Sequence, residues 1–138
     1  MSQIHGTWPS VSFKASATLA AYVIVKPGTG ANLVALHDTN TAQIIGVTQQ
    51  ASVGGANSSV LVALNGCAKV TAGASVSSGA ILIPQTATGF AVEDGAGGYI
   101  NTATALANFS LGLALDAGDT NSTIEVLLRP QQIRFDFV

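Results

Sequence analysis

The sequence predicts an all-β protein, a small barrel built from two related halves. Three observations predict this class: short β-branched runs between turn residues, an apolar fraction dominated by small and branched side chains, and an internal repeat. With 138 residues, the chain is most simply one domain, long enough to bury a core of its own.

The segment from residue 59 to residue 92 shows the strand pattern most clearly. Four short apolar runs are separated by Asn-Gly, Ala-Gly-Ala-Ser and Thr-Ala-Thr-Gly, and they span residues 59–64, 68–71, 80–83 and 90–92. The dipeptide Asn65-Gly66 predicts a tight hairpin turn between the first two runs, because both residues accept positive φ angles. Apolar residues occupy both faces of the first run, so we expect both faces of that strand to be covered.

The rest of the chain predicts six more strands and two arms. The predicted strands span residues 11–14, 22–26, 33–36, 44–48, 110–116 and 122–129, and a short helix is plausible only at 103–109. Pro130 is expected to close the domain. This divides the chain into an N-terminal arm (1–10), a β-barrel domain (11–130) and a strand-like C-terminal tail (131–138).

The repeat supports the division of the barrel into two halves. Residues 57–64 (NSSVLVAL) match residues 121–128 (NSTIEVLL), an offset of 121 − 57 = 64, and each segment follows a strand with a central glycine, Gly46 or Gly112. A weaker match pairs residues 21–25 with 79–83. A glycine inside a strand usually marks a bulge or the close approach of another backbone. We therefore expect two related halves folded into one barrel.

The composition favours a protein partner over nucleic acid or a membrane. Charged residues make up 9% of the chain and the net charge is −2, against about 25% charged residues in an average domain. The five basic residues are scattered, so no stripe is available for a phosphate backbone. No apolar run approaches the ~20 residues of a membrane span, and the N-terminus does not read as a signal peptide. Low-charge apolar surface is usually hidden against a partner or a second copy.

The sequence offers no convincing catalytic or cofactor site. His37 and Asp38 adjoin, but no G-x-S-x-G motif accompanies them, so the pair is predicted to be a solvated loop tip. Residues 27–30 lack the Lys-Ser/Thr of a phosphate-binding loop. The single Cys67 excludes an internal disulfide and a cysteine-based zinc site, and it is expected to be a small buried hydrophobe. We expect no enzyme activity and no cofactor.

Acidic residues gather in two turns, where a structural metal is the less favoured alternative. Asp116, Asp119 and Asn121 share one turn, and Glu93 and Asp94 share another. A calcium loop of the EF-hand kind starting at Asp116 would need a glutamate at its twelfth position, where this chain has leucine. Asp and Asn are common in turns for local hydrogen-bonding reasons, so we predict no metal.

Several pieces of the sequence, in their order and spacing, resemble the capsid cement (head decoration) proteins of tailed bacteriophages. These pieces are Ile45-Gly46-Val47, residues 60–73 (VLVALNGCAKVTAG), residues 78–82 (SGAIL), residues 111–114 (LGLA) and residues 124–129 (IEVLLR). The resemblance implies a small β-clip or β-tulip domain without enzymatic activity. It further implies a virion protein on the outer surface of the expanded head, where it braces contacts between major capsid proteins. Members of that family are commonly trimers, and a dimer remains the alternative.

Both ends of the chain depart from this family pattern. The N-terminal lead carries Trp8, and the tail alternates Ile133, Phe135 and Phe137 with polar residues, the period of a strand with one apolar face. We predict that these four side chains contact the capsid or a neighbouring subunit, the tail by adding a strand to a sheet edge.

Two alternative functions stay open from the sequence. The first is a small-molecule or carbohydrate-binding β-barrel module, and the second is a minor tail or baseplate β module.

Overall fold

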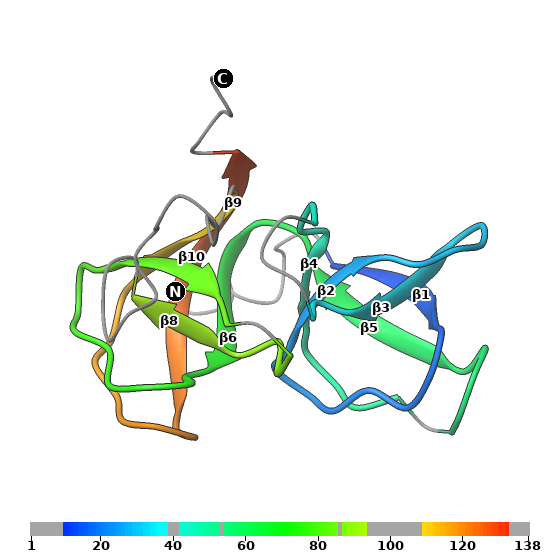
Figure 1. Cartoon of the computed structure of the whole chain (residues 1–138), viewed down its shortest axis with the longest axis horizontal. Helices are drawn as coiled ribbons and strands as arrows, with labels where there is room; N and C mark the ends of the chain where they lie inside the picture. Colours follow the sequence, from blue (N-terminus) through cyan, green and yellow to red (C-terminus); the bar gives the residue numbers. More distant parts are fainter. Residues whose placement is uncertain (1–9, 39–41, 53, 86, 94–108, 133–138) are drawn as a thin grey trace.

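The computed structural model describes residues 10–38, 42–52, 54–85, 87–93 and 109–132. These residues form ten β-strands and no helix, which confirms the all-β class (Figure 1). Within this part of the chain, no helix is long and apolar enough to cross a membrane. The helix considered at 103–109 falls outside these residues, apart from Phe109, which begins a strand.

The first half of the chain forms a closed five-stranded barrel, at the right of Figure 1. Its strand order is β1-β3-β2-β4-β5, and β1 closes the ring by pairing in parallel with β3 and antiparallel with β5. The strands are β1 (Ser10–Ala15), β2 (Ile24–Pro27), β3 (Leu33–Leu36), β4 (Gly46–Thr48) and β5 (Ser59–Ala63). A buried cluster that includes Val25, Val34, Val60 and Val62 fills this barrel.

The second half forms a five-stranded sheet in the order β6-β10-β9-β7-β8, at the left of Figure 1. An isolated parallel bridge between Ala72 and Ala91 joins the ends of its two edge strands. The strands are β6 (Gly66–Thr71), β7 (Ile81–Pro84), β8 (Ala91–Glu93), β9 (Phe109–Ala114) and β10 (Thr123–Gln132).

The two halves repeat the same topology. When β6 to β10 are matched in order with β1 to β5, each pairing of the first half recurs in the second with the same direction. The register recurs too: Ala15 faces Val34, and Ala72 faces Ala91, an offset of 57 on both strands (72 − 15 and 91 − 34). This confirms the duplication. The small barrel built from two related halves is thus what the structure shows, with the closed ring formed by the first copy and a second sheet formed by the other.

Backbone conformation follows the duplication even where the residue type does not. Three pairs of equivalent residues share a positive φ: Tyr22 and Gly79, Asn32 and Gly89, and Asn57 and Asn121. The first two pairs are 57 residues apart and the third 64 (79 − 22, 89 − 32 and 121 − 57). The predicted match of residues 21–25 with 79–83 is therefore wrong by one position.

The strand-interior glycines mark close backbone contacts, as predicted. A Cβ atom at Gly46 would collide with the carbonyl oxygen of Ala63, and one at Gly112 would collide with that of Leu127. Ala63 and Leu127 are themselves equivalent, because they occupy the same register positions of β5 and β10. The same steric requirement thus explains both glycines.

Asn65-Gly66 does not form the predicted hairpin. Strand β5 already pairs with β1 on one side and with β4 on the other, so no edge is free for β6. Gly66 adopts a φ of 85°, and the dipeptide carries the chain from the barrel into the second sheet.

Pro130 does not close the last strand either. Strand β10 continues to Gln132, and its pairing with β9 shifts register between Leu128 and Gln131. Proline is tolerated in such an irregularity because no regular ladder hydrogen bond is required there.

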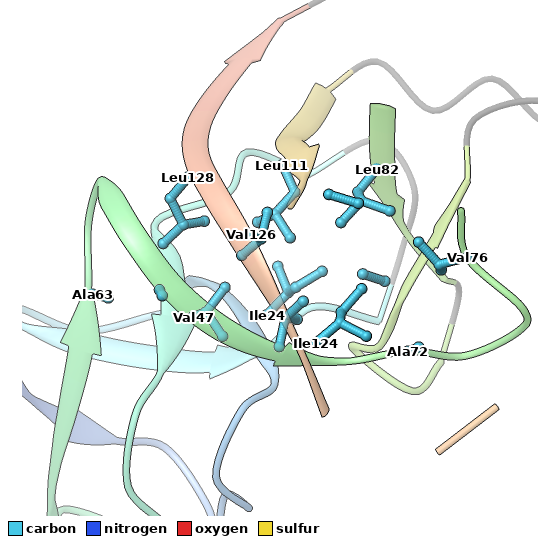
Figure 2. Packing of buried hydrophobic residues seen from close by; sticks show 14 residues of the cluster. Ile24, Val47, Ala63, Ala72, Val76, Leu82, Leu111, Ile124, Val126 and Leu128 are labelled. Atoms are coloured by element: carbon cyan, nitrogen blue, oxygen red, sulfur yellow. The ribbon is translucent and has the colours of Figure 1, made fainter. Parts of the chain in front are cut away.

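The first half docks directly into the core of the second. Ile24, Val47 and Ala63 belong to the first half, yet they join the buried cluster of the second, where Figure 2 shows Ile24 beside Ile124 and Val126. All three docked side chains are at most 3% exposed.

The backbone at the docked segment explains why only the first barrel closes fully. In the second half, Thr71 N–H donates to Tyr22 O (2.9 Å), and Ile24 N–H donates to Gly89 O (2.8 Å). In the first half, the equivalent residues bond directly, from Lys14 N–H to Asn32 O (2.9 Å). Residues 22–24 therefore bridge a gap between β6 and β8.

Candidate functional site

The contact residues predicted from the sequence lie outside the described part of the chain. Trp8, Ile133, Phe135 and Phe137 are all in the two terminal segments that the structure does not describe. Their role at the capsid or subunit interface stays a prediction.

His37 and Asp38 have separate environments. The His37 side chain is fully buried, and its Nε2 lies 2.8 Å from Ala42 O. A carbonyl oxygen can only accept, so Nε2 carries the proton. The Nδ1 atom is buried and has no hydrogen-bond partner among the described residues. Asp38 is exposed and accepts a 2.6 Å hydrogen bond from Lys26 Nζ.

The prediction of a solvated loop tip is therefore wrong for His37, although it suits Asp38. The backbone of His37 continues the pairing of β3 with β2 by donating to Ile24 O at 2.9 Å. The residue is thus still part of the barrel wall, and its ring is withdrawn from solvent. The two side chains do not share the hydrogen bond that a catalytic triad needs.

We expect the stability of the protein to fall on mild acidification because of His37. Burial lowers the pKa of His37 below its usual 6.5, an effect that nearby Lys26 adds to, while the Ala42 hydrogen bond and Asp38 oppose it. The unfolded chain then binds a proton more readily than the folded one, so the stabilisation is complete above about pH 6.5 and is lost as the pH falls below that value.

This expectation is checked by melting temperatures measured from about pH 7.5 to about pH 5. His37→Gln should flatten the profile in this range, whereas His5→Gln, at the other histidine, should leave it unchanged. The Lys26 hydrogen bond lowers the pKa of Asp38 below 3.8, so the stability that this carboxylate contributes is complete over this pH range and is lost only in more acidic solution. A wild-type profile that is already flat would contradict the assignment.

Two of the turn acids, Asp119 and Glu93, accept hydrogen bonds from serines. The backbone oxygen of Asp119 accepts from Ser122 N–H (3.0 Å) and from Ser122 Oγ (2.7 Å). The equivalent turn of the first half uses Gly55 and Ser58 in the same way, at 3.3 and 2.7 Å. Glu93 accepts from the backbone N–H of Ser77. Among the residues that the structure describes, no group of three or more His, Cys, Asp or Glu could hold a metal ion.

The second sheet presents a row of apolar side chains to solvent. We call this the outer row: Ile81, Leu113, Leu127 and Cys67, which lie side by side on β7, β9, β10 and β6 in consecutive register. Ile81 is 52% exposed and Leu113 38%, and Leu127 and Cys67 are half-buried. Cys67 is thus a partly accessible free thiol, and the prediction that it is buried is wrong.

Two surface hollows lie where the halves meet. The first is lined by Ile44, Ile45, Leu64, Asn65, Arg129 and Pro130, and the second by Tyr22, Gln49, Cys67, Ala68, Lys69 and Glu125. In the second hollow, the Gln49 amide bonds the backbone of Lys69, with Nε2 donating to its oxygen at 3.1 Å and Oε1 accepting from its N–H at 3.4 Å. These polar groups connect the two halves.

Comparison with solved structures shows what the chain resembles in its fold. No protein-family model matches the chain, and no curated protein matches its sequence. Among solved structures, the chain matches the N base of head fiber gp8.5 in bacteriophage phi29, with a TM-score of 0.63. The two proteins share a fold. The match covers 92% of this chain and 98% of that one at 16% sequence identity.

Proposed function

We propose that this chain is a structural protein of a bacteriophage virion, and that it binds the outer surface of the expanded head as a decoration (cement) protein. The observation that carries the proposal is the likeness in fold to a head fiber base, which extends over nearly the whole of both chains. The major capsid protein is the proposed partner. The chain is proposed to act as a homo-oligomer, with a trimer favoured over a dimer.

The sequence adds a second and independent line of support. Its ordered pieces resemble the cement proteins of tailed phages, whereas the structural neighbour is a base of a head fiber. The two likenesses agree on a protein attached to the head, and they differ on whether it braces the lattice or supports a fiber. We favour the cement role because the sequence resemblance runs through most of the chain.

The charge of the chain determines how such attachment would work. A net charge of −2 from so few ionisable groups gives little long-range steering. Apolar burial, at about 25 cal/mol per Å², would then supply most of the affinity. Linking several weak footprints in one oligomer can raise avidity by about 10²–10⁴-fold.

The test is to mix the purified full chain with expanded heads that lack it and to measure binding by cosedimentation. We expect saturable binding that persists in about 0.5 M NaCl, because salt of that strength screens charge but does not weaken apolar contacts. Absence of saturable binding, or loss of most of the protein in salt, would contradict the proposal.

A truncated chain that ends at Gln132 tests the predicted tail contact in the same assay. We expect it to fold and to bind at least about tenfold more weakly, a change of about 1.4 kcal/mol. Equal affinity of the two chains would show that Ile133, Phe135 and Phe137 are not part of the contact. The head-binding proposal itself would still be tested by the full chain.

A further inference from the structure

Because the chain is duplicated, each residue in the contact between the halves has an equivalent residue in the other half. Ile24, Val47 and Ala63 of the first half correspond to Ile81, Leu113 and Leu127 of the second, by the register of their strands. The first three are buried in the neighbouring half. The second three belong to the outer row, which has no neighbouring half to cover it.

A fourth residue of the first half that contacts the second half, Gln49, also has an exposed apolar equivalent. Gln49 connects the first half to the Lys69 backbone. Gly46 and Gly112 are 66 residues apart, and the same offset makes Leu115 the equivalent of Gln49 (115 − 49 = 66). Leu115 is 43% exposed. The outer row therefore continues into a further apolar side chain at a position that makes a contact in the first half.

The second half, which receives Ile24, also contributes a residue whose equivalent in the first half is exposed. Ala68 of β6 takes part in the cluster that receives Ile24, and its equivalent on β1 is Val11 (68 − 11 = 57), which is 42% exposed. The large exposed hydrophobics of the described residues are Val11, Ile81, Leu113 and Leu115. Each of the four is equivalent to a residue that takes part in the contact between the halves.

We propose that the outer row of one molecule docks against a second copy of this chain. The surface that receives it is the apolar rim of the first half, where Val11 is exposed. The contact would repeat, between molecules, the arrangement that each molecule already contains between its halves. Such a contact is heterologous, because two different surfaces meet, and it leads to a ring if the rotation closes. Burial of exposed apolar side chains supplies its driving force.

The intermolecular contact must differ from the internal one in its backbone. In the second half, residues 22–24 occupy the gap between β6 and β8. The equivalent gap in the first half is closed, because Lys14 N–H donates directly to Asn32 O. The second copy can therefore offer its apolar rim, Val11 with the half-buried Phe13, but no backbone partners. We expect association that is weaker than the internal contact and that depends on protein concentration.

Sedimentation velocity over a concentration series of the full chain tests this proposal without any phage head. Wild-type protein should associate reversibly, and Leu113→Glu and Val11→Glu should each weaken association at least about tenfold, through burial of an unpaired charge. Thr120→Glu is the matched control, since it adds the same charge at an exposed turn residue of the second half, and it should associate as wild type does. Melting temperatures of the variants establish that they are folded.

The single native cysteine shows which surfaces meet. We mix a V11C/C67S double variant with wild-type protein and add a short bismaleimide. The head-to-tail contact predicts a cross-linked pair that needs both proteins, because Cys67 ends the outer row of one chain and position 11 lies on the other. Wild type that stays monomeric throughout, Leu113→Glu that associates unchanged, or cross-linking of Cys67 to Cys67 alone would each overturn the proposal. Failure to bind heads would not, since no head takes part.

Discussion

Gly112→Ala should destabilise the protein by at least about 3 kcal/mol, a large fraction of the roughly 5–15 kcal/mol by which folded domains are stable. The added methyl group would meet the backbone carbonyl of Leu127, and Arg129 N is also close by. Neither is the end of a flexible side chain, so a strand would have to shift. Gly112 also has a φ of 155°, which side chains rarely adopt. Urea denaturation of the purified protein measures the effect.

Gly55→Ala provides the matched control for this experiment. A Cβ atom at Gly55 would meet nothing within 4 Å, and the residue has no positive φ. Its free energy of unfolding should stay within about 0.5 kcal/mol of wild type. Equal stability of the two variants would contradict the close contact of β9 with β10. Gly46→Ala should behave like Gly112→Ala, since it meets the equivalent carbonyl of Ala63.

Ile24→Ala should lower the free energy of unfolding by about 2–5 kcal/mol, the range for large-to-small substitutions in a core. The Ile24 side chain is fully buried between Ile124 and its neighbours in the second half, so its removal leaves a cavity at the junction (Figure 2). Thermal and urea denaturation measure the loss. If the halves unfold as one cooperative unit in wild type, this variant is where two transitions should first separate.

Ile81→Ala is the control that the duplication itself supplies. Ile81 has the same residue type at the equivalent strand position, and it is 52% exposed. In dilute protein its truncation should cost less than about 1 kcal/mol, because little buried surface is lost. If Ile24→Ala and Ile81→Ala were equally mild, the first half would not be docked in the core of the second.

Most strands could be predicted from the sequence because each is a short β-branched run between turn residues. The run at Leu33–Leu36 was predicted with its observed bounds, and other strands differ by a few residues at their ends. The close contacts at Gly46 and Gly112 could be predicted as well, because a strand-interior glycine reports a steric requirement that is local. Prediction failed at Pro130, where a register shift lets the strand continue.

Long-range pairing could not be predicted. The Asn65-Gly66 signal is local, whereas the partners of β5 are fixed by β1 and β4 from far along the chain. The offset of 57 was hidden for a related reason. What the copies share at Tyr22 and Gly79 is a positive φ, which different residue types can supply.

The outer row was not identified from the sequence because it has the pattern of an ordinary strand. Ile81 and Leu113 face each other on neighbouring strands as Ile24 and Val47 do, and only the docking of the halves buries one pair and exposes the other. The burial of His37 has a similar cause. Its position beside Asp38 suggested a polar loop, but the backbone pairing with β2 continues through it.

The number of copies per virion tests the central claim most directly. Quantitative mass spectrometry of purified particles, from a phage whose genome carries the gene for this chain, compares its amount with that of the major capsid protein. A decoration protein that braces the head lattice predicts copies on the order of hundreds, in a fixed ratio to the capsid protein, because it occupies repeated symmetric sites. A few copies per particle, or none, would contradict the account.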